Sequence, residues 1–350
     1  MNTFDEFIGN VAAVRRLRAT LSDERHTPVR CHAYLLTGPS QVGKGTLARA
    51  MAAALVCTWP GEVGPSASGV DHQGPPSEAA AVPCGACRAC RLVARAGHTD
   101  VRIVEAESGR RGVTIEQIRQ LEHDAALRPY EATRKVFIVA GVEAMTEAAA
   151  NALLKTLEEP PADTVLVLTA DDVSQVLPTI VSRCREVPLR AVPASEIEAA
   201  LIGRGVAAEP ARVLARLSAG RAGWAIAAVA DSGRVTTHTQ RIDLLETLLS
   251  QPRRQRLPAA ADMGDAAAVK SVLDVWLGWW RDALLVQQDL PDLVTNTERV
   301  DQLRHLGAGH PPEAVWRALT RIQETRQQVD ANVNVRLAVE ALLLDLPERS

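Results

Sequence analysis

The stretch LLTGPSQVGKGTLARA, residues 35–50, is the part of the sequence that decides the fold. Its centre, GPSQVGKG, matches the GxxxxGK pattern of a phosphate-binding loop, with Gly38, Gly43 and Lys44 at the defining positions. The glycines allow backbone N–H groups to turn around a phosphate, and the lysine reaches the terminal phosphates of a nucleotide. An apolar run, AYLLTG, precedes the loop and an alanine-rich segment follows it, so we expect a buried strand, the loop and a helix in that order.

One position in the loop departs from the usual pattern. Gly45 follows the lysine, where a Ser or Thr hydroxyl ordinarily ligates Mg²⁺, although Thr46 is one residue away. The Lys-Gly-Thr order also resembles the loop of adenylate-kinase-like nucleotide kinases, so Gly45 alone does not exclude catalysis. Whether the loop is a working, a weak or a vestigial binding site for ATP therefore depends on a second, acidic site. The candidate residues of the loop are Gly38, Pro39, Ser40, Gln41, Val42, Gly43, Lys44, Gly45 and Thr46.

Strands and helices alternate through the first half of the chain. Further strand candidates are DVRIVEA (100–106), KVFIVAG (135–141) and TVLVLTA (164–170), with helices predicted between them. Such alternation favours a parallel sheet covered by helices on both faces, which is an α/β fold. Beyond VSRCREVPLRAVP (181–193) the strand signal stops, and helices alone are predicted.

A chain of 350 residues exceeds what one hydrophobic core usually organises, so we expect several domains. The simplest division has an α/β domain over residues 1–190, a small helical domain over 191–236 and a helical C-terminal domain over 237–350. Within the first domain, the segment 58–83 is rich in Pro, Gly, Ser and Ala, and we interpret it as a flexible surface insertion.

Charge and hydropathy argue against several classes of protein. The formal net charge is −3, so no overall positive field indicates nucleic-acid binding, and any DNA contact would need a local patch. The N-terminus lacks a basic segment followed by an apolar core, which argues against a secretory signal. The sequence contains no run of about eighteen apolar residues, so nothing in it indicates a membrane span. We expect a cytoplasmic protein, whose six cysteines suit metal binding better than disulfides.

Cys84, Cys87 and Cys90 form a CxxCxxC cluster. Thiolates at this spacing can supply three corners of a tetrahedral zinc site, and a fourth ligand is needed to complete it. The preceding cysteine is Cys57, on the far side of the insertion. Using Cys57 as the fourth ligand closes a long loop, which costs roughly 1 kcal/mol more than closing a short loop. Structural zinc provides on the order of 10 kcal/mol, so this cost does not exclude Cys57. An iron–sulfur cluster is the alternative to zinc. The reserve candidates for the fourth ligand are His72 and His98.

Longer segments of the sequence resemble a known family. The run KVFIVAGVEAMTEAAANALLKTLEEPPADTVLVL (135–168), followed by LPTIVSRCREVPL (177–189), resembles bacterial DNA polymerase III clamp-loader subunits, the gamma/tau ATPase and its relative delta-prime. NALLKTLEEPP and SRC are the most specific segments, and CGACRAC and VDANVNVRLAVEALLL match as well. The resemblance covers nearly the whole chain. It implies an AAA+ domain, a helical lid and a helical collar, with a zinc module over residues 57–90 in which Cys57 is the fourth ligand.

The resemblance also implies that parts of an ATPase site are missing. In the ATPase members, the strand that corresponds to KVFIV ends in Asp-Glu, whereas Ala140 and Gly141 take those places here. Glu143 is the nearest carboxylate, and it lies beyond the strand end. Gly223 stands where the ATPases carry a sensing arginine. Together with Gly45, these losses point to the non-hydrolysing delta-prime branch of the family.

The same resemblance gives a role to Arg183, in the SRC motif. In the family this motif supplies an arginine finger to the nucleotide site of the adjacent subunit, and a guanidinium suits the task because it stays charged and forks two donors onto phosphate oxygens. The implied partners are gamma/tau and delta subunits and, through the complex, the sliding clamp and primer-template DNA. Two other interpretations remain: a gamma/tau-like ATPase with a degenerate but active site, and a nucleotide kinase, for which we find no acceptor site or arginine-rich lid.

The C-terminal helical domain carries a tryptophan cluster. Trp276, Trp279 and Trp280 are spaced three and four residues apart, which puts them on one face of a helix. Such a face is more often core than a ligand platform. By resemblance, this domain forms the oligomeric collar.

Overall fold

The computed structural model describes residues 3–24, 31–58, 83–107, 112–330 and 333–348. The chain divides into two compact units: unit 1 comprises residues 1–196 and 220–223, and unit 2 comprises residues 197–219 and 224–350. The predicted boundary at 236/237 falls inside helix α10 (Gly233–Ser250), and the division into three domains stays a prediction. Most of the predicted insertion at 58–83, including His72, lies outside the described residues.

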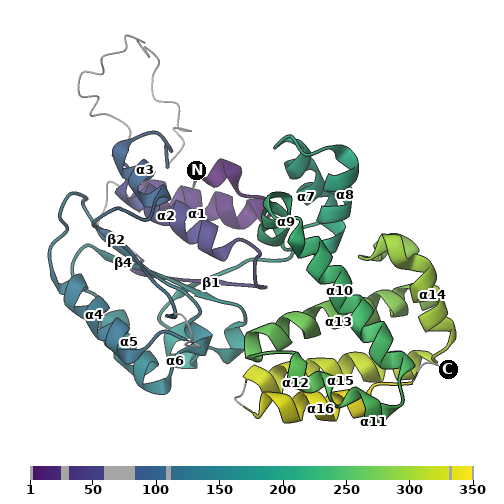
Figure 1. The fold of residues 1–350 in the computed structure, drawn as a ribbon. Coiled ribbons are helices and arrows are strands. Elements are labelled where there is room, and N and C mark those ends of the chain that lie inside the picture. The colour runs from purple at the N-terminus through teal and green to yellow at the C-terminus, as the bar shows by residue number, and fades with distance from the viewer. Residues whose placement is uncertain (1–2, 25–30, 59–82, 108–111, 331–332, 349–350) are drawn as a thin grey trace. The chain divides into compact units, whose positions relative to one another are not determined.

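Five parallel strands form the centre of unit 1 (Figure 1). They are β1 (Ala33–Thr37), β2 (Val101–Val104), β3 (Lys135–Val139), β4 (Thr164–Ala170) and β5 (Arg185–Pro188), and their order across the sheet is β2-β3-β4-β1-β5. The register pairs Thr37, the last residue of β1, with Ala170 of β4 and Pro188 of β5. Three neighbouring strands therefore end at the same edge, and the predicted α/β fold with a parallel sheet is confirmed.

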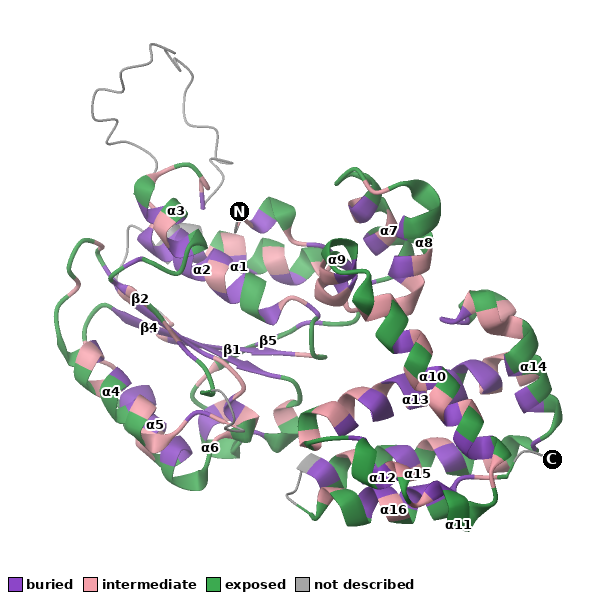
Figure 2. Cartoon of the chain, in the orientation of Figure 1, coloured by how far each residue is buried: buried purple, intermediate pink, exposed green. Residues whose placement is uncertain are grey.

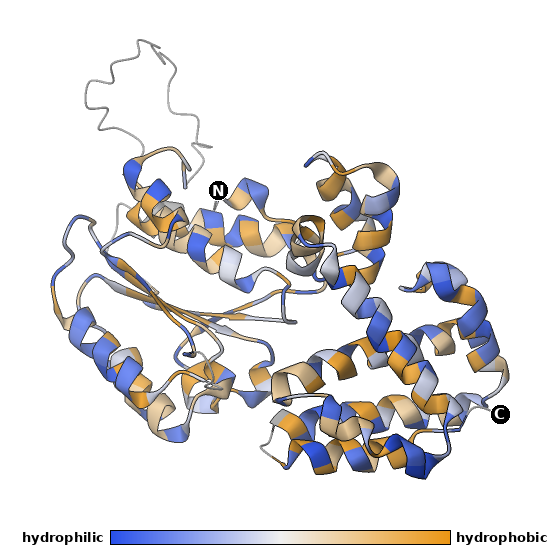
Figure 3. Ribbon diagram, viewed as in Figure 1, coloured by the Kyte–Doolittle hydropathy of each residue, from blue (hydrophilic) through white to orange (hydrophobic). Residues whose placement is uncertain are grey.

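Helices cover both faces of this sheet (Figure 1). On one face lie α1 (Val11–Glu24), α2 (Lys44–Val56) and α3 (Arg88–Ala94), and on the other lie α4 (Ile115–Ala126), α5 (Glu147–Glu158) and α6 (Pro178–Val181). Alternate residues of β1 serve the two cores: Leu36 packs in the core with α1 and α2, and Leu35 packs in the core with α4 and α5. The central strands are buried (Figure 2) and apolar (Figure 3) because both faces are covered, so they read as continuous apolar runs in the sequence.

Short 3₁₀ turns complete unit 1. They are η1 (Phe4–Glu6), η2 (Val142–Ala144) and η3 (Val173–Gln175), of which η2 directly follows the end of β3 and η3 follows the end of β4. Because η2 and η3 follow the carboxyl ends of β3 and β4, these two turns lie at the edge of the sheet where the phosphate loop is expected.

Unit 2 is helical throughout its described residues. Helices α7 (Ala194–Ile202) and α9 (Ala222–Ala230) each span a boundary between the units. The other elements are α8 (Ala208–Leu217), α10, α11 (Arg253–Arg256), α12 (Ala259–Asp262), α13 (Ala266–Gln287), η4 (Pro291–Leu293), η5 (Thr297–Arg299), α14 (Val300–Ala308), α15 (Pro312–Asp330) and α16 (Val335–Asp345). Trp276, Trp279 and Trp280 are completely buried on α13, so the predicted core role of this face is confirmed. Within the described ranges, every helix is too short or too polar to cross a membrane.

A buried arginine joins two helix ends in unit 2. The Arg256 guanidinium is completely buried and donates to backbone carbonyls only. Its acceptors include the oxygens of Gln251, after the end of α10, at 3.0 Å and Leu346, after the end of α16, at 2.8 Å. Three further carbonyls, those of Leu249, Leu343 and Pro347, lie within 3.4 Å of its Nη atoms. The last carbonyls of a helix lack partners within the helix, and Arg256 satisfies them for two helices at once.

Replacing Arg256 with Leu is expected to lower the free energy of unfolding of unit 2 by about 3 kcal/mol, because several buried carbonyls lose their donor. Tryptophan fluorescence during urea unfolding measures the change, since five of the six tryptophans lie in unit 2. The matched control is Arg254→Leu on the same helix, where the side chain is exposed and the stability should hardly change. Equal effects of the two substitutions would contradict the assigned role of Arg256.

Candidate nucleotide and metal sites

The phosphate loop lies between β1 and α2, at the carboxyl edge of the sheet. Gly38 and Gly43 have φ angles of 140° and 113°, which favour glycine. Lys44 is the first residue of α2, so the predicted alanine-rich helix begins within the loop motif. The other loop residues differ in exposure: Pro39, Ser40, Gln41, Gly45 and Thr46 are exposed, and Val42 is buried.

The side chain of Lys44 is held inside the protein. Its ammonium group donates to the carbonyl oxygens of Gly38 at 2.6 Å and Pro39 at 2.9 Å, and it pairs with Asp171 Oδ1 at 2.7 Å. A lysine ammonium has three N–H groups, so these contacts use all of its donors. The Lys44 side chain is 9% exposed. In this conformation Lys44 offers no donor to a bound phosphate.

The strand end where the ATPase members carry two acids has a different backbone here. β3 ends at Val139, and the Ala140 N–H donates to the Val104 carbonyl at 2.9 Å. Gly141 has φ 67° and ψ 48°, which is the left-handed region. A side chain in that region costs on the order of 1–2 kcal/mol. Ala140 and Gly141 carry no acidic side chain, and the left-handed backbone at Gly141 would also disfavour a Glu or Asp at that position.

Two carboxylates meet beside Lys44. Glu143, in η2, accepts a hydrogen bond on Oε1 from the Asp171 backbone N–H at 2.9 Å. Its Oε2 is buried and has no hydrogen-bond partner among the described residues. Burial raises the pKa of Glu143, and the nearby charge of Asp171 raises it further. Asp171 was not among the candidate site residues, although it directly follows the predicted strand 164–170, whose end lies beside the loop.

Gly223 contacts the phosphate loop directly. Its N–H donates to the Gln41 carbonyl oxygen at 2.8 Å, and a Cβ added to Gly223 would lie 2.8 Å from that same oxygen. Such an approach is closer than a real Cβ tolerates. The position expected to lack a sensing arginine is thus packed against the loop through its backbone, and a side chain there requires the loop to move.

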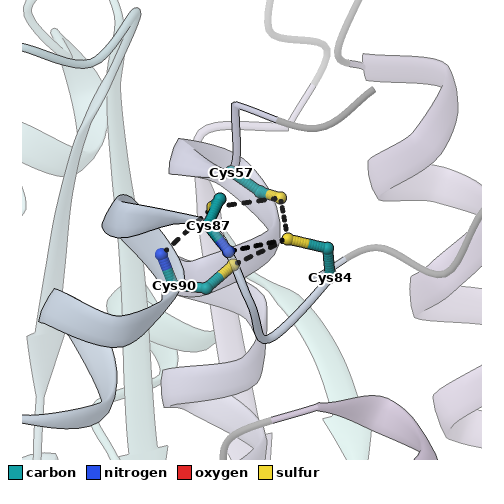
Figure 4. Close-up of side chains that lie close together, drawn as sticks. All are labelled: Cys57, Cys84, Cys87 and Cys90. Carbon is teal, nitrogen blue, oxygen red and sulfur yellow. Dashed lines mark hydrogen bonds between the residues drawn. The ribbon is translucent and has the colours of Figure 1, made fainter. Parts of the chain in front are cut away.

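The structure brings four cysteines together (Figure 4). Cys57 follows the end of α2, Cys84 and Cys87 precede α3, and Cys90 lies within α3. Three of the Sγ–Sγ distances are 3.6, 3.9 and 3.9 Å, and all four Sγ atoms lie within 4.8 Å of one another. Four thiolates around one zinc ion at about 2.3 Å are separated by about 3.8 Å. The arrangement therefore fits a single tetrahedral ion.

Backbone N–H groups point at two of these sulfurs. The Cys87 N–H donates to Cys84 Sγ at 3.3 Å, and the Cys90 N–H donates to Cys87 Sγ at 3.4 Å (Figure 4). Burial acts to raise the pKa of Cys87, but hydrogen bonds, led by that from the Cys90 backbone, outweigh burial and lower it. Hydrogen bonds to sulfur favour the thiolate, which is the form that binds metal.

The alternatives for this site fit less well. Sulfur atoms this close have space between them for one ion, and no room for the several irons and bridging sulfides of a cluster. His98, a reserve ligand, is buried, its Nδ1 accepts from the Asp100 N–H at 3.1 Å, and it is not part of the four-cysteine group. Outside the group, burial raises the pKa of the Cys184 thiol to about 12, so Cys184 stays protonated.

Arg183 lies in the turn between α6 and β5. Its Nη2 pairs with Glu158 Oε1 at 2.6 Å, and its Nη1 donates to the Thr179 carbonyl at 3.0 Å. The Arg183 side chain is 36% exposed and that of Glu158 is 51% exposed. An ion pair this exposed is worth only about 0–1 kcal/mol, so the guanidinium can exchange Glu158 for another anion at small cost.

Comparison with known proteins covers both units. Residues 10–193 match the family model described as DNA polymerase III, delta subunit, and residues 237–348 match the model of its C-terminal part. A DNA polymerase III subunit delta-prime from Pseudomonas aeruginosa is 32% identical over 322 residues, which cover 89% of this chain and 90% of the relative. The chain belongs to the DNA polymerase III delta-prime family. The delta-prime subunit of Bacillus subtilis is 27% identical over 326 residues, which cover 91% of each chain.

The relationship to gamma/tau is more limited. The DNA polymerase III subunit gamma/tau of Mycobacterium bovis is 32% identical over 199 residues, which cover 57% of this chain and 30% of the relative. The delta-prime relatives match along most of their own length, so the predicted family and its delta-prime branch are confirmed.

Glu143→Gln should alter how the stability of unit 1 depends on pH. A carboxyl whose pKa is raised in the folded state contributes stability that is fully present below the unfolded pKa, near 4.5, and is lost as pH rises through the folded pKa. Gln cannot titrate. The melting temperature of the variant should therefore rise relative to that of the wild type as pH increases above 4.5. Melting curves recorded from about pH 4 to about pH 8, a range in which a buried carboxyl titrates, measure the difference. A constant offset, like that expected for the exposed control Glu159→Gln, would refute it.

Proposed function

We propose that this protein is the delta-prime subunit of a bacterial DNA polymerase III clamp loader, and that it acts in the cytoplasm. It assembles with gamma/tau and delta subunits and helps to load the sliding clamp onto primer-template DNA. The helical regions 191–236 and 237–350 serve as lid and collar. The observation that carries this proposal is the match to delta-prime subunits over nine-tenths of both chains, 89% and 90% for the Pseudomonas aeruginosa relative.

The proposed subunit does not hydrolyse ATP. Support comes from the residues at four positions. Gly45 has no hydroxyl for Mg²⁺, Ala140 and Gly141 have no carboxylate, and Gly223 has no guanidinium. Lys44, the residue that would reach the terminal phosphates, has all its donors engaged within the chain. We infer that the protein contributes to catalysis only through its neighbour.

Arg183 is the residue proposed to act on that neighbour. A trans-acting arginine has to be exposed, charged and able to leave its resting partner, and Arg183 satisfies these conditions because its ion pair with Glu158 is exposed. On assembly, the phosphate oxygens of ATP in the adjacent subunit replace the Glu158 carboxylate as the acceptor.

Arg183→Ala is expected to lower the DNA-stimulated ATPase rate of the reconstituted loader. The fall should be smaller than the roughly 10³ to 10⁵ seen where a single trans arginine serves the only site, because other subunits of the ring also hydrolyse ATP. Arg183→Lys, which keeps the charge and loses the fork, should give an intermediate rate. Arg185→Ala is the control, since Arg185 is exposed two residues away. An unchanged ATPase rate for Arg183→Ala in an intact complex would contradict the proposed role of Arg183 as a trans-acting arginine.

We also propose that the four-cysteine group holds a structural zinc ion. The sulfur spacing supports one tetrahedral ion, and the four protein ligands leave no position for a substrate. The ion ties the end of α2, which begins with the phosphate loop, to α3.

Cys57→Ser should lower the zinc content of the purified chain from one ion toward none and reduce its melting temperature, because one of four thiolates is lost. Atomic emission measures the metal. Cys31→Ser is the matched control, since Cys31 lies outside the group, and it should retain the zinc. A wild-type chain that contains iron, or a Cys57→Ser chain that keeps its full zinc, contradicts the proposed site.

The competing function is that of a gamma/tau-like ATPase with a degenerate site. The similarity to gamma/tau over 199 residues favours testing it. ATP hydrolysis by the purified chain alone separates the two functions: the delta-prime proposal expects no activity above background, and a rate abolished by Lys44→Ala would establish the ATPase.

A further inference from the structure

We infer that Asp171 is an internal ligand of the phosphate loop, which takes the place of a nucleotide phosphate on Lys44 and thereby excludes nucleotides from this chain. The inference goes beyond the proposed function, because it concerns the isolated subunit and holds whether or not Arg183 acts in trans.

The sheet places Asp171 at the entrance of the loop. β4 pairs with β1 so that Ala170 lies opposite Thr37, and the Gly38 N–H donates to the Ala170 carbonyl at 3.2 Å. Asp171 is the next residue, so its side chain begins at the level where the loop leaves β1. The Glu143 carboxylate accepts a hydrogen bond from the Asp171 backbone N–H at 2.9 Å, which fixes the backbone position of Asp171. From there the Asp171 carboxylate reaches Lys44 Nζ at 2.7 Å.

Lys44 already has the contact that a phosphate would otherwise supply. Its ammonium group donates to one carboxylate and two carbonyls, which are acceptors as phosphate oxygens are. A phosphate can bind Lys44 only by displacing one of these three acceptors, and it competes most directly with the Asp171 carboxylate, the charged one. The displaced carboxylate would remain next to the incoming anion, since its backbone is held by Glu143.

Charge favours the internal ligand over an external one. One ammonium, that of Lys44, faces two carboxylates, those of Asp171 and Glu143. A phosphate would add a further anion to this group, and like charges at a few ångströms repel.

The same two carboxylates are poorly placed to bind Mg²⁺ for a nucleotide. Asp171 Oδ1 is engaged by Lys44, Glu143 Oε1 is engaged by the Asp171 N–H, and Glu143 Oε2 is buried away from solvent. Three of their four oxygens are therefore unavailable to a metal that accompanies a nucleotide.

The test is anion binding by the purified full-length chain, with inorganic pyrophosphate and MgATP as probes in titration calorimetry. Asp171→Ala frees Lys44 and removes one negative charge, so it should bind pyrophosphate at least about tenfold more tightly than the wild type. The double variant Lys44→Ala with Asp171→Ala should lose that gain. Asp172→Asn is the matched control: this neighbouring carboxylate accepts from the Ser174 N–H, and its removal should leave binding as in the wild type.

Two outcomes would overturn the inference. One is an Asp171→Ala chain that binds no better than the wild type, and the other is a wild-type chain whose MgATP binding disappears in Asp171→Ala, which would make Asp171 a ligand for the nucleotide complex. Should Asp171→Ala fold poorly, Asp171→Asn and Lys44→Met provide a second measure. Their effects on melting temperature should be non-additive in the double variant, and additive losses would show that the two side chains are not partners.

Discussion

The parallel pairing of β4 with β1 is the interaction on which the site depends. Both strands are completely buried, and their register brings Ala170 beside Thr37, so that the residues after β4 lie against the phosphate loop. Lys44 can then be satisfied within the chain by Asp171. The contacts of the Lys44 ammonium are therefore all made within the chain, and they follow from the strand order of the sheet.

Local patterns were enough to predict the α/β fold and the position of the phosphate loop, because a buried parallel strand appears as a continuous apolar run. They were not enough to find Asp171. The family pattern places its acids at the end of strand 135–139, whereas the carboxylate that reaches Lys44 follows strand 164–170. Finding it requires the strand order, which is a property of pairing between distant segments.

The same distinction between local and distant contacts applies elsewhere. The CxxCxxC spacing predicts a metal site, but Cys57 enters it from the end of α2, 27 residues before Cys84 in the chain, and only the family resemblance selected it beforehand. The tryptophan face of α13 follows from helical period, and its burial is confirmed. Arg256 gave no such signal, because its acceptor at Leu346 is 90 residues away.

Gly141 and Gly223 each resist the side chain that the resemblance places there in the ATPase members. A carboxylate restored at Gly141 meets a left-handed backbone, and an arginine restored at Gly223 meets the carbonyl of Gln41. Each of these substitutions alone would cost stability before any part of an ATPase site is complete. The course of the backbone, as well as the missing side chains, therefore distinguishes this chain from the ATPase members of the family.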